Sequence, residues 1–134
     1  MIIGIGNDII RISRIQSVMN KFEDKFLERV FTPYEREKCK NRRNRAACFA
    51  KRYAAKEALS KAIGTGFRKG VYWRDIGVVN GSSGKPRIIL SGGALSQLEK
   101  LTPLGFISQI DLTITDEPPF AEAFIIISAL NSET

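Results

Sequence analysis

The spacing of apolar residues along this chain changes from a helical period in its first half to a strand period near its end. Apolar residues recur every three or four positions over 12–30, which predicts one amphipathic helix. Residues 107–115 instead alternate apolar and polar side chains, and a turn at 116–119 leads into a last strand over 121–130. Helices first and an antiparallel sheet later predict a single α+β domain over residues 1–134, with the N-terminal helices packed on the sheet.

Shorter signals complete this outline. Residues 2–5 form an apolar run that ends in Gly6-Asn7-Asp8, which predicts a buried strand followed by a sharp turn. Thr32-Pro33-Tyr34-Glu35 is a capping box with proline at the first helical position, so a second helix begins there. Helix-forming residues dominate 46–63, and Gly64 suits the end of that helix. The remaining predicted elements are the two strands of a hairpin and a short helix, at 76–79, 87–90 and 93–101.

The chain is basic and contains no histidine. It carries 21 Lys and Arg against 14 Asp and Glu, a net charge of +7, so we expect an anionic partner: nucleic acid, phosphorylated metabolite, anionic membrane or acidic protein. The lack of histidine excludes Ser-His-Asp triads, Cys-His pairs and His-ligated metals within one chain. No apolar run approaches the roughly 20 residues of a membrane-spanning helix. The apolar start lacks the positive region of a signal peptide, so we expect no membrane association and a cytoplasmic location.

The two cysteines, Cys39 and Cys48, are too few for a four-ligand zinc site. A disulfide between them is one outcome. However, two cysteines in a chain of 134 residues are usual for a reduced cytosolic protein. We therefore expect ordinary, partly buried thiols.

Two carboxylates stand out. Glu57 shares one face of the predicted helix 46–63 with small and apolar residues, where a carboxylate is costly unless it is paired or coordinated. Helix geometry alone favours an ion pair with Lys61, four residues on. Asp8 follows two glycines that let another group approach the backbone closely. An ordinary N-cap for the next helix is the competing interpretation.

A cationic stripe on the same helix carries Arg45, Arg52 and Lys56 around Phe49. An anion would relieve the repulsion among these cations, and a solvated charged face fits equally well. Together with two carboxylates, such cations are compatible with an enzyme that handles phosphates. Mg²⁺ is typically held by one or two carboxylates, waters and substrate phosphates, with no need for histidine. Spacing alone does not establish this.

Five blocks of sequence, in order, resemble the holo-acyl-carrier-protein synthase family. They are Gly4-Ile5-Gly6-Asn7-Asp8-Ile9 with Arg14-Ile15, Phe31-Thr32-Pro33-x-Glu35, residues 49–66, Asp75-Ile76 and Gly84-Lys85-Pro86. The resemblance runs from the first residues to about Ala129, nearly the whole chain. A single block is weak evidence for a family resemblance, whereas five ordered blocks at the family's spacing are strong evidence.

The resemblance implies the site residues. Asp8 and Glu57 match the acidic pair that holds Mg²⁺ on the pyrophosphate of coenzyme A, and Lys61 matches a lysine that contacts phosphate oxygens near the metal. These three residues form the implied catalytic set. The implied nucleotide-binding positions are Arg45, Arg52, Lys61, Gly64, Thr65, Gly84, Lys85 and Pro86. The implied docking surface for an acidic acyl carrier protein consists of cations on the first helix, Arg14, Lys21 and Lys25.

The implied reaction is attack by a carrier-protein serine hydroxyl on the β-phosphate of coenzyme A, which gives holo carrier protein and adenosine 3',5'-bisphosphate. Mg²⁺ and Lys61 would stabilise charge on the pyrophosphate and the leaving group. A metal-bound water and Glu57 both fit the general base. Many relatives carry histidine where this chain has Asp116, so we leave Asp116 outside the catalytic set.

Family members of this length are typically homotrimers with active sites between subunits. The resemblance therefore implies that Asp8 and Glu57 meet Lys85 and Pro86 across an interface.

A basic nucleic-acid-binding module, using residues 38–45, is the alternative from another class. Such proteins usually interleave aromatic and basic residues so that bases can stack, and this tract has no aromatic residue. The alternative also leaves Asp8 and Glu57 unexplained, so nucleic acid is not the expected partner. A non-catalytic coenzyme A binder fits less well, because it needs no paired carboxylates.

Overall fold

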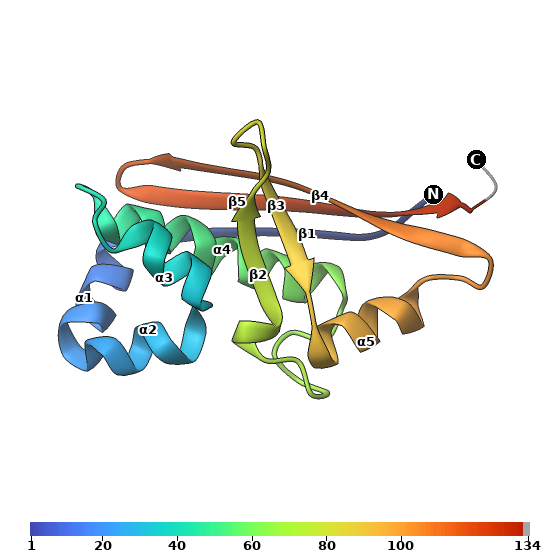
Figure 1. Cartoon of the computed structure of the whole chain (residues 1–134), viewed down its shortest axis with the longest axis horizontal. Helices are drawn as coiled ribbons and strands as arrows, with labels where there is room; N and C mark the ends of the chain where they lie inside the picture. The colour runs from blue at the N-terminus through green and yellow to red at the C-terminus, as the bar shows by residue number, and fades with distance from the viewer. Residues whose placement is uncertain (133–134) are drawn as a thin grey trace.

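Three long antiparallel strands form the larger of two sheets in the computed structural model, which describes residues 1–132 (Figure 1). Their order across the sheet is β1 (Ile2–Arg11), β5 (Phe120–Asn131) and β4 (Phe106–Glu117). Helix α4 (Arg45–Ala62) packs along one face of this sheet and contacts all three strands. The prediction of an α+β fold with helices packed on an antiparallel sheet is confirmed.

The predicted turn after the first strand is wrong, because β1 continues straight through Gly6, Asn7 and Asp8 to Arg11. The two glycines serve packing instead. A Cβ atom at Gly4 or Gly6 would collide with the backbone carbonyl oxygens of Ala62 and Ala58 in α4. Glycine at these positions lets the backbones of β1 and α4 come into direct contact.

The single helix predicted over 12–30 is two helices, α1 (Ile12–Phe22) and α2 (Asp24–Val30). The chain changes direction at Glu23, whose φ of 52° lies in the left-handed region. This bend turns Leu27 of α2 into the core alongside Ile15 and Met19 of α1, and it leaves Phe22 half exposed.

Helix α3 (Pro33–Cys39) begins at the predicted capping box. The Glu35 N–H donates to Thr32 Oγ1 at 3.2 Å, and the Thr32 N–H donates to Glu35 Oε1 at 2.8 Å. Glu35 is completely buried and also forms an ion pair with the equally buried Lys56 of α4, with 2.7 Å between Oε1 and Nζ. This pair ties α3 to α4 in the core.

The second sheet is the predicted hairpin, β2 (Ile76–Asn80) and β3 (Pro86–Leu90). A 3₁₀ turn, η1 (Trp73–Asp75), precedes it, and α5 (Gly92–Leu101) follows it. The buried ion pair also holds this hairpin, because Lys56 Nζ donates to the Ile76 carbonyl and the Val78 N–H donates to Glu35 Oε2 at 2.7 Å.

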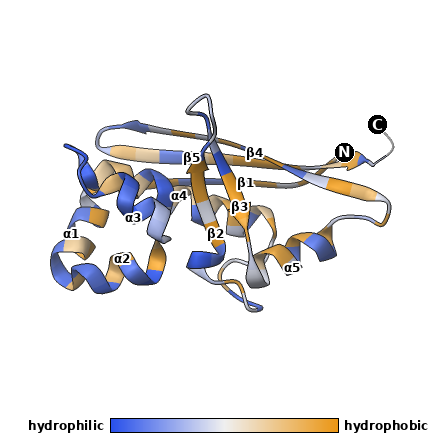
Figure 2. Ribbon diagram, in the orientation of Figure 1, coloured by the Kyte–Doolittle hydropathy of each residue, from blue (hydrophilic) through white to orange (hydrophobic). Residues whose placement is uncertain are grey.

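The two faces of the larger sheet differ. Ile125 and Ile127 of β5 are fully buried on the face that α4 covers. On the opposite face Ile5, Ile9 and Ile107 are each more than half exposed, and the helices of the described chain lie on the other side (Figures 1 and 2). None of the helices within residues 1–132 is long and apolar enough to cross a membrane.

Candidate active site

Strand β1 and helix α4 bring Asp8, Glu57 and Lys61 together. Gly6 lies against Ala58, so Asp8, two residues on and on the same face of the strand, lies beside the turn of α4 that carries Glu57 and Lys61. Lys61 Nζ donates to Asp8 Oδ1 at 3.0 Å and to the Asn7 carbonyl at 3.1 Å. We call Asp8, Glu57 and Lys61 the acidic cluster.

The two simple alternatives for these carboxylates do not hold. Lys61 pairs with Asp8 of β1, and no ion pair between Glu57 and Lys61 forms within the described chain. Asp8 is not an N-cap either, because β1 extends to Arg11, which precedes the first residue of α1. Tertiary contact between strand and helix replaced the local pairings that sequence spacing favours.

The electrostatics of the acidic cluster are compatible with a divalent cation. Burial raises the pKa of Glu57, the nearby carboxylate of Asp8 raises it further, and Lys61 and Arg14 oppose the rise. Burial and Glu57 likewise raise the pKa of Tyr53, one turn earlier on α4. A divalent cation can relieve the repulsion between two such carboxylates, which have one lysine beside them.

The donor set fits Mg²⁺. No group of three or more Asp, Glu or Cys side chains that could hold a metal by itself is found in residues 1–132. Mg²⁺ does not require such a group, because it commonly takes one or two carboxylates, waters and substrate phosphates. Asp8 and Glu57 are two carboxylates close enough to interact, as such a site requires.

The segment that follows α4 lies directly beyond Lys61. Gly64 has a φ of 83° and its N–H donates to the Lys61 carbonyl, so it ends the helix as predicted. The Thr65 hydroxyl donates to the Gly66 carbonyl at 2.8 Å. Gly64 and Thr65 therefore stand at the same end of α4 as the acidic cluster.

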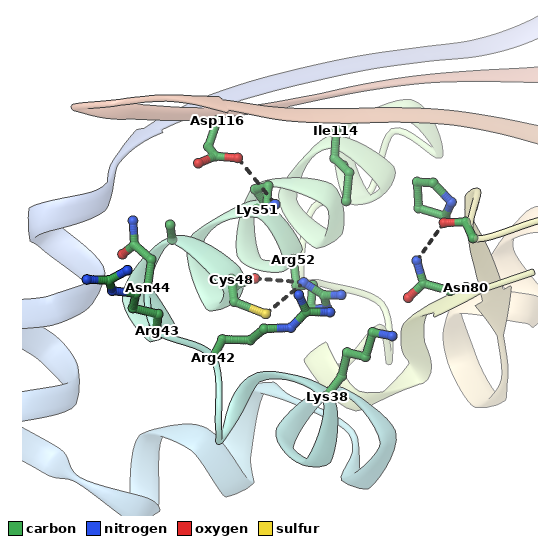
Figure 3. Close-up of a pocket in the computed structure, with 13 residues that line it drawn as sticks. Lys38, Arg42, Arg43, Asn44, Cys48, Lys51, Arg52, Asn80, Ile114 and Asp116 are labelled. Atoms are coloured by element: carbon green, nitrogen blue, oxygen red, sulfur yellow. Dashed lines mark hydrogen bonds and ion pairs between the residues drawn. The ribbon is translucent and has the colours of Figure 1, made fainter.

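A separate cationic pocket of about 640 Å³ lies at the other end of α4, between α3, the hairpin and β4 (Figure 3). Asp116 is its only carboxylate within the described chain, and its Oδ1 lies 3.2 Å from Lys51 Nζ. The hairpin contributes Asn80, Gly84 and Pro86. Five cationic side chains of the described residues line this pocket: Lys38, Arg42, Arg43, Lys51 and Arg52.

Arg52 is the most buried cation of the pocket. It is 5% exposed, and its Nη1 donates to the Cys48 carbonyl at 2.9 Å and to Cys48 Sγ at 3.2 Å. Its Nε is buried and has no partner within residues 1–132. Burial lowers the pKa of Arg52, and the carboxylate of Glu35 opposes this change. A guanidinium stays charged in proteins, so this side chain favours a bound anion.

The expectation of free thiols is wrong, because Cys39 and Cys48 form a disulfide. The end of α3 and the first turn of α4 lie side by side, which places the two Cα atoms 5.6 Å apart, within the usual range for a disulfide. Cys48 also lines the cationic pocket.

The predicted cationic stripe on α4 is divided among three environments. Lys56 is buried against Glu35, so an internal carboxylate rather than a bound anion compensates it. Arg45 lies 5.7 Å from the Phe49 ring and lines different hollows, so the structure does not bring it together with Arg52. Lys85 likewise lines a neighbouring hollow rather than the cationic pocket.

The docking candidates Arg14, Lys21 and Lys25 are all exposed, on α1 and α2. Of the three, Arg14 acts electrostatically on Glu57. The acidic cluster and the cationic pocket are separate within one chain, because neither Asp8, Glu57 nor Lys61 lines that pocket.

Sequence reasoning missed most of the cationic pocket. From the sequence, Lys38, Arg42 and Arg43 were considered only as part of a basic tract, and Lys51 was assigned no role. The tract's charge was a usable signal, but only the meeting of α3, α4 and the hairpin shows where these side chains gather.

Three comparisons agree on the relatives of this chain. The family model described as the 4'-phosphopantetheinyl transferase superfamily matches residues 4–115. A holo-[acyl-carrier-protein] synthase from Parvibaculum lavamentivorans is 57% identical over 130 residues, 97% of this chain and 98% of the relative.

Solved structures show the same likeness. The holo-[acyl-carrier-protein] synthase from Neisseria meningitidis is 37% identical with a TM-score of 0.82, over 96% of this chain and 99% of that one. The Bacillus anthracis holo-(acyl-carrier-protein) synthase, in complex with CoA (3',5'-ADP), is 37% identical with a TM-score of 0.76, over 98% and 99%.

Proposed function

The chain belongs to the 4'-phosphopantetheinyl transferase superfamily, and from this premise we propose that it transfers 4'-phosphopantetheine from coenzyme A to a serine of apo acyl carrier protein. The products are holo acyl carrier protein and adenosine 3',5'-bisphosphate. The names of the relatives support this reaction, and so does the CoA in the Bacillus anthracis complex.

The observation that carries the proposal is the meeting of Asp8, Glu57 and Lys61 between β1 and α4. In the proposed reaction the serine oxygen forms a bond to the β-phosphorus, and the bond from that phosphorus to the bridging oxygen breaks. The negative charge passes to the leaving adenosine bisphosphate. Lys61 is placed to stabilise that charge, because its ammonium already donates hydrogen bonds at this point.

Asp8 and Glu57 are the residues that would hold Mg²⁺. When bound there, Mg²⁺ supplies positive charge that neutralises phosphate oxygens. The carboxylates orient the site, and the partly buried Glu57 can also hold a proton, since burial and Asp8 raise its pKa. Glu57 and a water both fit as the acceptor of the serine proton.

The cationic pocket would hold the phosphates of the nucleotide portion of coenzyme A. Arg52 Nε has no partner within residues 1–132, and Gly84 and Pro86 of the hairpin also line this pocket. We also keep Arg45, Gly64, Thr65 and Lys85 as proposed contacts of the nucleotide. These four residues lie apart from the cationic pocket within one chain, which fits a nucleotide site that is shared between subunits.

We propose a homotrimer whose active sites combine the acidic cluster of one subunit with the cationic pocket of the next. The exposed isoleucines Ile5, Ile9 and Ile107 support this, because apolar patches of this kind mark protein interfaces. Sedimentation should give the mass of three chains, and Ile9→Asp should shift it towards one chain. A wild-type protein that sediments as a monomer at assay concentrations would contradict the trimer.

The exposed cations Arg14, Lys21 and Lys25 form the proposed docking surface for an acidic carrier protein. Arg14→Glu should raise KM for carrier protein by about tenfold and change KM for coenzyme A by less than about twofold, since rim charges act mainly on encounter. Steady-state kinetics with each substrate varied would test this.

Lys100→Glu is the matched control for this charge reversal, since Lys100 is exposed on α5, away from α1. Equal loss for both substrates in Arg14→Glu would contradict the docking role and would point to the effect of Arg14 on Glu57.

Metal affinity should depend on pH through Glu57. A proton and a metal ion compete for this carboxylate, and its pKa is raised in the folded protein. Affinity should therefore begin to fall at a pH above the ordinary range for glutamate, near 4.3, as the pH is lowered. Binding of Mn²⁺, followed by water-proton relaxation, measures this without turnover.

Glu57→Gln is the control for the pH experiment, because it removes the titrating group. The remaining binding should be weaker and should lose this pH dependence. An affinity that stays constant down to the ordinary range of glutamate would refute a role for Glu57 as a ligand.

The proposed reaction is tested by the release of adenosine 3',5'-bisphosphate, separated by chromatography, from coenzyme A and apo carrier protein. Release should require carrier protein and stop with EDTA. Nucleic acid gains no support, because the cationic pocket is lined, among residues 1–132, by no aromatic side chain on which a base could stack. A cytoplasmic location stays a prediction of the sequence.

A further inference from the structure

The Cys39–Cys48 disulfide closes a loop that carries part of the cationic pocket. We call residues 40–44 the basic loop; it joins α3 to α4. Arg42, Arg43 and Asn44 of this loop line the pocket, and Cys48 lines it as well (Figure 3). The disulfide thus joins the two ends of a segment whose side chains form one wall of the pocket.

Few other contacts hold the basic loop. All of its residues are exposed. At its start, the Lys40 N–H donates to the Arg36 carbonyl at 3.0 Å, and Lys40 pairs with Glu37 on the surface. Its other backbone hydrogen bonds run from the Arg42 N–H to the Cys39 carbonyl and from the Cys48 N–H to the Asn44 carbonyl, both at 3.1 Å. A covalent link between its ends is therefore the strongest constraint on where Arg42 and Arg43 lie.

The disulfide also touches the buried cation of the pocket. Cys48 Sγ accepts a hydrogen bond from Arg52 Nη1 at 3.2 Å. Cys48 is 8% exposed and lines the pocket, so the pocket is the route by which a small thiol would reach its sulfur. Disulfides in reducing compartments are usually transient or redox-sensing rather than permanent.

We propose that the Cys39–Cys48 disulfide is a redox-controlled positioning element for the cationic pocket. With the disulfide formed, the basic loop holds Arg42 and Arg43 against the pocket and a nucleotide phosphate binds tightly. With the disulfide reduced, the loop is released and affinity falls. This inference rests on the proposed function, because it takes the phosphates of coenzyme A as the ligand of the pocket.

The redox step is thiol–disulfide exchange with a dithiol. One thiolate of the dithiol attacks a sulfur of the disulfide and forms a mixed disulfide, and the second thiolate of the dithiol then displaces the protein sulfur. Two electrons and two protons pass to Cys39 and Cys48, which become thiols, and the dithiol becomes a cyclic disulfide. No other reactant is required.

Thermodynamic linkage makes the effect reciprocal. If reduction weakens binding of a nucleotide by some factor, saturating nucleotide must make reduction less favourable by the same factor. A nucleotide that binds more tightly to the oxidised protein therefore stabilises the disulfide against reduction.

The experiment measures the Kd for adenosine 3',5'-bisphosphate by calorimetry, on protein with the disulfide formed and on protein reduced with dithiothreitol. Reduction should raise Kd on the order of fivefold, the factor expected when one or two long side chains must be ordered on binding. Mn²⁺ binding to the acidic cluster should change by less than about twofold, whereas general destabilisation would weaken both. Saturating nucleotide should shift the dithiothreitol midpoint by the factor found for Kd.

Two variants sharpen the test. Cys39→Ser with Cys48→Ser should bind as reduced protein does, with or without dithiothreitol. Should that variant fail to fold, the double variant Arg42→Ala with Arg43→Ala keeps the disulfide. In this variant, reduction should leave the Kd for adenosine 3',5'-bisphosphate nearly unchanged.

Equal Kd values in oxidised and reduced wild-type protein would overturn this inference while leaving the proposed function intact. Absence of nucleotide binding in both states would overturn the assignment of the pocket and, with it, the inference.

Discussion

Glu57→Gln is expected to lower kcat/KM for phosphopantetheine transfer by about a thousandfold, with the fold unchanged. The amide keeps the size of the side chain but removes the charge that, together with Asp8, would hold Mg²⁺. A divalent cation at a reacting phosphate contributes several kcal/mol to transition-state stabilisation, and about 4 kcal/mol corresponds to this factor. Asp8→Asn should have a similar effect and should also weaken the hold on Lys61.

The control for this experiment is Glu99→Gln, which removes a carboxylate from an exposed position on α5 and should retain full activity. Unchanged circular dichroism and sedimentation would show that the Glu57 and Asp8 variants still fold and assemble. A Glu57→Gln enzyme as active as wild type would remove Glu57 from the catalytic set.

The second large effect concerns stability. Lys56→Met leaves the Glu35 carboxylate buried without its cation, and Glu35→Gln leaves the Lys56 ammonium buried without its anion. Breaking a fully buried pair by removing one partner typically costs about 3–5 kcal/mol, because an uncompensated charge stays in the core. Urea unfolding at fixed protein concentration would measure the loss.

The double variant, Glu35→Gln with Lys56→Met, should be destabilised by clearly less than the sum of the two single changes. Lys40→Met is the matched control, because Lys40 pairs with Glu37 on the surface, where such a change typically costs about 0–1 kcal/mol. Single variants that cost no more than Lys40→Met would show that the buried pair contributes little.

Local signals in the sequence predicted most of the secondary structure. The capping box at Thr32, the helix that ends just before Gly64 and the alternating strands near the C-terminus each depend on residues close together in the chain. Such features survive folding because their hydrogen bonds are local. The same local reasoning therefore found α3, α4, the hairpin and the β4–β5 pair.

Tertiary packing decided the cases where sequence reasoning failed. Gly4 and Gly6 look like turn residues, yet they serve the close approach of α4. No glycine or proline marks the bend at Glu23, so the helical spacing appeared unbroken across it.

The site was only partly predictable for the same reason. Asp8, Glu57 and Lys61 were predicted from their sequence motifs as candidate site residues, and the structure places them close together. Spacing along α4 placed Lys56 in an anion-binding stripe, but its partner Glu35 comes from α3, which helical periodicity cannot reveal. The disulfide and the cationic pocket likewise need α3, α4 and the hairpin to meet.

The most direct test of the central proposal is the intact mass of apo acyl carrier protein after incubation with this protein, coenzyme A and Mg²⁺. The proposal predicts a mass gain of one phosphopantetheinyl group, which EDTA abolishes and which a carrier protein with alanine in place of its acceptor serine does not show. No gain on several carrier proteins, with the enzyme folded and the metal present, would contradict the proposed transfer.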